Sequence, residues 1–149
     1  MIHIEVKPSL QANRFSEMLE RAALATLDQQ AVDGDLTLVV SDDGQLQELN
    51  RSYLGIDAPT DVLAFAASEV DPETGRAYLG DVLISLPRAA QQAEAAGHGV
   101  EAELQLLVVH GVLHLLGHDH SGAQEKKRMW AAQAGVLETL GLGSVQVNE

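Results

Sequence analysis

The sequence predicts one α+β domain, in which a small mixed β-sheet of about four strands packs against about five helices. Short apolar runs bounded by turn residues occur in the first 85 residues, as expected for strands. The rest of the chain has the periodicity and end signals of three successive helices. No internal repeat, low-complexity tract or flexible linker interrupts the pattern, so we treat residues 1–149 as a single domain.

Four segments have the apolar pattern of strands: residues 2–7, 36–40, 62–66 and 81–85. The first alternates apolar and polar residues and ends at Pro8, and a turn at Asp33-Gly34 precedes the second. The last two are separated by the turn sequence DPETG and by no segment long enough for a helix. We therefore expect these two strands to be adjacent and antiparallel.

Five segments have the periodicity or end signals of helices: residues 9–30, 45–54, 85–97, 100–116 and 121–140. Ser9 and Ser85 are candidate N-caps, and Asp42 with Gln45 resembles a capping box. Ser121 and Gln124 form a similar pair at the start of the last helix. Each of the last four helices is followed by glycine, the residue that most readily ends a helix.

Composition excludes several classes of protein. The chain has no cysteine, so a disulfide scaffold, a thiolate metal site and a cysteine nucleophile are all excluded. The N-terminus lacks the pattern of a signal peptide, and histidines interrupt the longest apolar stretch, so we expect a cytoplasmic protein with no membrane partner. The net charge of −13 repels polyanions at long range, and no DNA partner is expected.

The segment HGVLHLLGHDH, residues 110–120, contains four of the six histidines. His110 and His114 are one turn apart on the same face of a helix, and Gly117 allows the chain to reverse so that His120 completes a triangle. A buried imidazole needs a partner for its polar nitrogen atoms, and one metal ion shared by both histidines supplies it. Three protein ligands and one open position are typical of catalytic zinc, so the spacing predicts a Zn²⁺ site with an open position.

Three neighbouring residues refine this prediction. His118 has less room to reach the metal than His120, and we expect it to contact substrate, to support the ligands or to be exposed. Asp119 either orients a liganding imidazole or caps the turn. Gly111 stands where the peptidase motif H-E-x-x-H has its glutamate base, which disfavours proteolysis.

These residues resemble the YbeY-type endoribonucleases. The family motif H-G-x-L-H-L-x-G-x-D-H matches residues 110–120, and the resemblance extends to residues 49–66, residues 78–85 and the late Leu140-Gly141. It implies a zincin-like fold, a divalent metal usually assigned as zinc, and His110, His114 and His120 as its ligands. It also implies a cytoplasmic enzyme that cleaves single-stranded rRNA on the small ribosomal subunit, in 16S rRNA 3′-end processing and ribosome quality control.

The chain departs from the family pattern in two places. Leu54 follows Tyr53 where the family usually has arginine, and residues 64–66 are Ala-Phe-Ala instead of Ser-Phe-Pro. Leucine cannot replace a guanidinium as a phosphate clamp. Arg51, or the basic run Lys126, Lys127 and Arg128, are candidates to bind substrate in its place, although such a run is also typical of a solvated helix face.

We therefore expect metal-assisted hydrolysis of a phosphodiester. Asp119, His118 or a metal-bound hydroxide are the candidate bases, and the RNA 2′-hydroxyl is an alternative nucleophile. Asp81 and residues 59–61 are further candidates for the floor of the cleft. Two other functions stay open: a zinc peptidase or amidase, and a ribosome-assembly protein with a vestigial metal site, which Leu54 favours.

Overall fold

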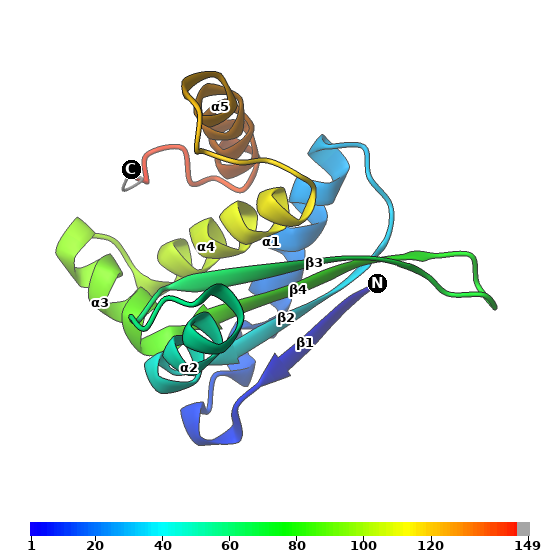
Figure 1. The fold of residues 1–149 in the computed structure, drawn as a ribbon. Helices are drawn as coiled ribbons and strands as arrows, with labels where there is room; N and C mark the ends of the chain where they lie inside the picture. The colour runs from blue at the N-terminus through cyan, green and yellow to red at the C-terminus, as the bar shows by residue number, and fades with distance from the viewer. Residues whose placement is uncertain (146–149) are drawn as a thin grey trace.

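The computed structural model describes residues 1–145, and in this part of the chain four strands form one mixed sheet (Figure 1). The strands are β1 (Ile2–Val6), β2 (Asp35–Ser41), β3 (Val62–Val70) and β4 (Ala77–Ser85), and their order in the sheet is β1-β2-β4-β3. β2 is parallel to both β1 and β4, whereas β3 is antiparallel to β4. The expected α+β class and the antiparallel pairing of the last two strands are both confirmed.

Residues 1–145 also form five α-helices: α1 (Ser16–Gln29), α2 (Asp43–Leu54), α3 (Leu86–Ala96), α4 (Val100–Leu115) and α5 (Ala123–Thr139). α4 lies along one face of the sheet between α1 and α3, and α5 packs on the outer side of α4 and α1 (Figure 1). α2 covers the opposite face. Alternate residues of β4 show this division, because Val82 and Ile84 belong to the main core with α4 and Leu83 packs against Leu46 of α2.

α4 is the centre of the main core, and it is apolar almost all round. Leu104, Leu106, Leu107 and Val109 are all buried, although at about 100° per residue they project to different sides of this helix. A helix that is hydrophobic on every side needs neighbours on every side, and here these are the sheet, α1, α3 and α5. The few polar side chains of α4 are therefore enclosed by other elements and require partners.

The first helix differs from its predicted range. The chain forms two short 3-10 turns, Pro8–Leu10 and Asn13–Phe15, and α1 begins only at Ser16. Between the turns Gln11 adopts a left-handed conformation with φ 51°, which interrupts a helix. The prediction of Ser9 as an N-cap is therefore wrong; burial of Phe15 and of the Ala12 methyl group holds this segment instead.

The last helix also starts later than predicted, at Ala123. Ser121 does not cap it, because its hydroxyl donates to Asp119 Oδ2 (2.6 Å) and Gly122 occupies the N-cap position. The two N-caps predicted within the middle of the chain are confirmed: Asp42 accepts from the backbone N–H of Gln45, and Ser85 accepts from that of Arg88.

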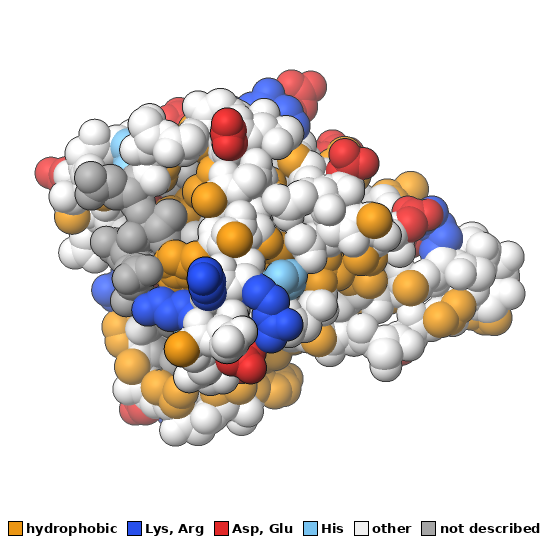
Figure 2. Space-filling model, turned by 90° about the horizontal axis from the view of Figure 1, so that it is seen from above, with side chains coloured by type: hydrophobic (Ala, Val, Ile, Leu, Met, Phe, Trp, Pro, Cys, Tyr) orange, Lys and Arg blue, Asp and Glu red, His pale blue; other side chains and the backbone are white. Residues whose placement is uncertain are grey.

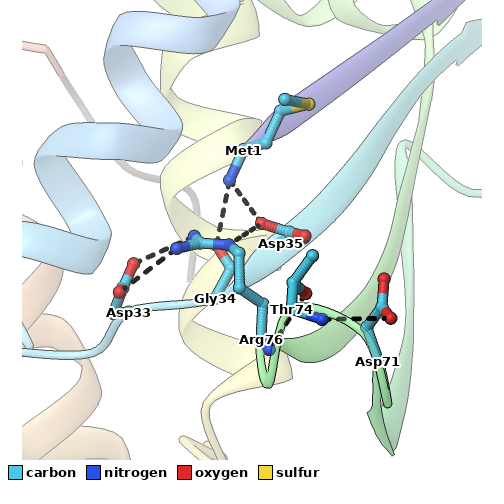
Figure 3. Close-up of polar contacts among 7 residues, drawn as sticks. All are labelled: Met1, Asp33, Gly34, Asp35, Asp71, Thr74 and Arg76. Atoms are coloured by element: carbon cyan, nitrogen blue, oxygen red, sulfur yellow. Dashed lines mark hydrogen bonds and ion pairs between the residues drawn. The ribbon is translucent and has the colours of Figure 1, made fainter.

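β3 and β4 are both longer than predicted, and together they form a hairpin that projects beyond the rest of the sheet (Figure 1). A polar cluster joins Arg76, directly after the turn of this hairpin, to the start of β2 and to the N-terminus (Figure 3). The guanidinium of Arg76 donates to Asp35 (2.8 Å) and to Asp33 (3.1 Å), and the amino group of Met1 also contacts Asp35. We call Arg76, Asp33, Asp35 and the Met1 amino group the Arg76 cluster.

Among residues 1–145, no helix combines the length and the apolar character that crossing a lipid bilayer demands.

Candidate metal centre

Three imidazoles meet where α4 ends. His110 and His114 lie one turn apart on α4, and His120 lies in the loop that follows. One nitrogen from each ring lies within 4.8 Å of the others, and the Nε2 atoms of His110 and His114 are 3.2 Å apart. The structure therefore brings together the three histidines that the sequence spacing selected, and we call them the histidine triad.

The turn after α4 positions His120. Gly117 has φ +97°, a conformation that a residue with a side chain rarely adopts. The N–H of His118 donates to the carbonyl of Leu113 (3.0 Å), and the N–H of Gly117 donates to that of His114 (3.1 Å), as in a Schellman motif. The chain therefore reverses within a few residues and brings His120 over the end of the helix.

Asp119 stabilises the loop that carries His120. Its Oδ1 atom accepts hydrogen bonds from the backbone N–H groups of His120 (2.7 Å) and Ser121 (3.3 Å). Of the two roles that the sequence left open for Asp119, the contacts correspond to capping the turn. These bonds, with the one from the Ser121 hydroxyl as the largest cause, lower the pKa of Asp119.

Two residues of α5 support the histidine triad, and sequence reasoning missed both. Nδ1 of His110 donates to Oε1 of Gln133 (2.9 Å), a side chain that is only 1% exposed. Because that nitrogen carries the proton, Nε2 keeps its lone pair for a metal. Trp130, one turn before Gln133, makes edge contacts with the rings of His110 and His120 at 5.8 and 5.7 Å.

The surroundings of the two α4 histidines disfavour their charged forms. Burial lowers the pKa of His110, and it lowers the pKa of His114 to about 4, with a smaller contribution from the neighbouring imidazoles. Near neutral pH both rings therefore present lone pairs instead of protons. Neutral imidazoles that face one another are the donor set that Zn²⁺ and similar transition metals prefer.

The geometry fits a metal ion with an open coordination position. Within residues 1–145 no fourth histidine or carboxylate joins the group of three. Structural zinc sites close the shell with four protein ligands, whereas catalytic sites use three. The donor set therefore fits a catalytic metal better than a structural one.

Gly111 shows why this site lacks the glutamate of the peptidase motif. A Cβ atom at this position would lie 2.5 Å from Cγ1 of Val82 and 3.3 Å from Cγ2 of Val62. α4 approaches the sheet so closely here that even alanine would force the two apart. A glutamate at position 111 is therefore incompatible with this packing.

The remaining predicted residues lie in different places. His118 donates from Nε2 to Oε1 of Gln30 (2.8 Å), at the end of α1, and so points to a different partner from the triad. Arg51 pairs with Glu48 on α2, across the sheet from α4. Asp81 accepts a hydrogen bond from the Tyr78 hydroxyl and, by strand alternation, lies on the α2 face as well.

The basic run on α5 lies beside the triad. The ammonium of Lys126 is 5.6 Å from the centroid of the Trp130 ring, which in turn contacts two of the three histidines. Arg128 lines a shallow hollow of about 250 Å³ together with His118 and Asp119. Figure 2 shows lysine and arginine side chains gathered on the α5 face of the molecule, close to an exposed histidine.

Comparison with known proteins gives consistent matches. The family model described as Endoribonuclease YbeY matches residues 2–141. The chain is 41% identical to the Endoribonuclease YbeY of Halalkalibacterium halodurans (94% of this chain, 92% of the relative). It is 45% identical to that of Pelotomaculum thermopropionicum (84% and 86%). Among solved structures, TM1509 from Thermotoga maritima matches with a TM-score of 0.61 at 22% identity (100% and 97%), which supports the fold.

Proposed function

The chain belongs to the YbeY family of endoribonucleases, and from that premise we propose that it cleaves single-stranded RNA with a divalent metal, Zn²⁺, held by His110, His114 and His120. The observation that carries the assignment of the ligands is the convergence of three imidazole nitrogens, all within 4.8 Å of one another, where α4 ends. The proposed substrate is rRNA on the small ribosomal subunit, in 16S 3′-end processing and quality control. This role places the protein in the cytoplasm.

In the proposed mechanism the metal ion supplies the chemistry, and side chains of the protein position the metal ligands. A divalent metal supplies Lewis acidity, which activates water near neutral pH and withdraws charge from a phosphate oxygen. Gln133 fixes the tautomer of His110 and thereby aims Nε2 at the cation. Trp130 packs its ring edge-on against His110 and His120 and so restricts how these two rings can turn. Asp119, through its bonds to the loop, positions His120.

We assign phosphate binding to the basic run on α5. Lys126 is separated from the histidine triad by a single aromatic ring, and Arg128 shares a hollow with two residues of the metal loop. Local cations also reduce the repulsion between RNA and a chain of net charge −13. Lys127, in the same turn of α5, extends this surface, whereas Arg51 lies across the sheet and is already paired with Glu48.

Proton transfer is assigned to His118 in preference to Asp119. Asp119 accepts three hydrogen bonds, and its lowered pKa makes it a weak base. His118 follows directly after the turn, and its ring is held by one hydrogen bond to Gln30. Proton transfer by His118 requires that this bond breaks when substrate binds.

One alternative has a specific observation in its favour. Leu54 is exposed at the end of α2, so the family's usual arginine has no replacement at that position. A ribosome-assembly protein with a vestigial metal site would tolerate this loss. The peptidase alternative is opposed by Gly111, whose position has no room for a glutamate.

A substrate comparison tests the proposal. Zinc-loaded protein is incubated with a single-stranded RNA, the same sequence as a duplex, and an unstructured peptide. We expect cleavage of the single strand alone. Cleavage of the peptide would support the amidase alternative, and no cleavage of any substrate together with binding to small subunits would support the vestigial one.

A pair of matched variants tests the phosphate assignment. Arg128→Ala removes a cation beside the metal loop, and Arg51→Ala removes one across the sheet. We expect the first to raise KM for RNA and to reduce the salt dependence of binding, and the second to leave both unchanged. A larger effect of Arg51→Ala than of Arg128→Ala would mean that RNA binds along α2 and not along α5.

A further inference from the structure

A cavity of about 100 Å³ lies beside His110, between the start of β3 and helices α3, α4 and α5. Its apolar wall consists of Val62, Leu106 and Leu107. Its polar lining, besides His110, consists of Asp61, Gln92, Glu103 and Gln133. One water needs about 10–15 Å³ by the same measure of volume, so the cavity has room for more than one or two waters.

The polar groups of this cavity have unused hydrogen-bonding capacity. Asp61 is half-buried, and its carboxylate has no hydrogen bond within residues 1–145. Every other Asp or Glu side chain in this part of the chain that is buried or half-buried has at least one. Glu103 is 3% exposed and uses Oε1 for His98 (2.7 Å), which leaves Oε2 without a partner in the described chain. None of these atoms is among the fully enclosed polar atoms of the described chain that lack a partner, so they are open to the cavity and available to a ligand.

Gln133 connects the cavity to the metal centre. Its Oε1 atom accepts from His110, and its Nε2 atom has no protein partner within residues 1–145. Because His110 also lines the cavity, a group bound there lies directly beside a metal ligand and the amide that orients it. The cavity is not a second metal site, because in the described chain the histidine triad alone brings three ligand atoms close together.

The chemistry of the lining selects one part of an RNA substrate. Two carboxylates repel phosphate, so the RNA backbone does not enter. A nucleobase has flat apolar faces that suit the wall of Val62, Leu106 and Leu107, and single-stranded RNA can turn a base out of its stack. Carboxylates accept from the amino and ring N–H groups of bases, and amides both donate and accept.

We propose that this cavity binds a guanine base of the RNA next to the scissile phosphate; this rests on the RNA cleavage proposed above. Guanine alone among the four bases presents two adjacent donors, N1–H and the N2 amino group, which a carboxylate can accept together. The amides of Gln92 and Gln133 can donate to its O6 and N7 atoms. The acidic residues of the site thus read a base, while the metal and the basic run on α5 bind phosphate.

Binding of short oligonucleotides tests the proposal without any cleavage. Metal-stripped protein is titrated with labelled UUUGUUU, UUUUUUU and the guanine oligonucleotide with inosine in place of guanosine, which removes only the N2 amino group. We expect guanine to bind about 10-fold more tightly than uracil, as for a good bidentate base contact, and inosine to lie between them. UUUAUUU and UUUCUUU are titrated in the same way. Equal binding of the guanine, inosine and uracil oligonucleotides, or tighter binding of the adenine or cytosine oligonucleotide than of the guanine one, would overturn the proposal.

Variants locate the preference. Asp61→Asn and Glu103→Gln each keep the shape of the side chain but remove an acceptor, and each should reduce the ratio of guanine to uracil affinity. Asp57→Asn, in the same loop but outside the cavity lining, is the matched control and should keep the full ratio. A ratio that survives both cavity variants would contradict the assignment, even if wild-type protein prefers guanine.

The two proposals fail in different ways. Zinc-loaded protein that cleaves all of these oligonucleotides equally well would overturn the guanine site and leave the RNA cleavage intact. Zinc-loaded protein that cleaves none of them would overturn the proposed function, whatever the binding ratios are.

Discussion

The Arg76 cluster and the histidine triad are both groups of ionisable side chains, but they differ in whether the protein itself satisfies them. In the Arg76 cluster opposite charges pair directly, and the guanidinium, next to the turn of the hairpin, donates to the carboxylates of Asp33 and Asp35 (Figure 3). In the triad three like groups face one another in a partly buried site, and the converging Nε2 atoms of His110 and His114 contact each other at 3.2 Å instead of an opposite charge. The charged groups of the Arg76 cluster have partners within the protein, whereas the nitrogen atoms of the triad need a cation as their partner.

This difference gives a physical criterion for a functional site. Clusters of charge are common at surfaces and usually contribute little to stability. A partly buried set of groups that destabilise one another's charged forms is costly unless a ligand binds there. The following predictions test whether the two clusters differ in this way.

The largest effect is expected from His114→Ala. It removes the central ligand on α4 and leaves two of three nitrogens, so the protein should purify without bound metal. RNA cleavage should fall by more than about 100-fold, beyond the effect typical of supporting residues. Metal content by elemental analysis and single-turnover cleavage measure the two effects. If the variant keeps both its bound metal and its cleavage rate, His114 is not a metal ligand.

The pH dependence of stability should come next. In metal-free protein the pKa of His114 lies near 4, below its ordinary value of 6.5. Between these two pH values the unfolded chain binds more protons than the folded one, so stability falls as the pH is lowered. We expect a loss of about 2 kcal/mol between pH 7.5 and pH 5 from this group.

Urea unfolding of wild-type and His114→Gln proteins, both without metal, isolates this contribution. The wild-type protein should lose more stability than the variant over the same pH range. Equal losses would mean that the folded protein does not suppress protonation of His114.

An intermediate effect is expected from Gln133→Leu. The variant removes the acceptor that orients His110, and the metal affinity should fall about 10–100-fold, as for other supporting residues. Gln105→Leu is the matched control, because Gln105 is also buried but its Oε1 atom has no hydrogen-bond partner. Competition with a chelating dye measures both affinities. If Gln105→Leu weakens metal binding equally, the effect of Gln133→Leu comes from changed packing of the core and not from the lost hydrogen bond to His110.

The smallest effect is expected from Arg76→Ala. Its ion pairs are exposed to solvent, so Tm should fall by at most about 4 °C, and less at high salt. Metal content and cleavage should not change. A loss of metal in this variant would mean that the Arg76 cluster and the histidine triad are coupled, contrary to this expectation.

The histidine triad could be predicted from the sequence because its determinants are local. His110 and His114 share a helix face at four-residue spacing, and Gly117 sets the turn that returns His120. The four glycine helix ends were also visible for this reason. In these cases neighbouring residues along the chain determine the geometry.

The parts of the site that sequence reasoning missed depend on contacts between distant segments. Gln133 and Trp130 reach the triad only because α5 packs over α4. Glu103 shares a cavity with Asp61, a residue that the sequence did select for the cleft, only because α4 packs beside the start of β3. Arg51 was a reasonable substrate-binding candidate until the fold placed α2 across the sheet. One feature of the sequence could have indicated these supporting residues: the polar Gln133 follows Trp130 by one turn on a partly apolar helix.

The most direct test of a metal-dependent site is to measure bound metal and RNA cleavage on the same sample through one cycle of chelation and zinc addition. We predict one metal ion per chain, loss of cleavage when it is removed, and recovery when it is restored in wild-type protein but not in His114→Ala. Undiminished cleavage by a sample with no detectable metal would contradict the assignment of the triad as the catalytic metal centre.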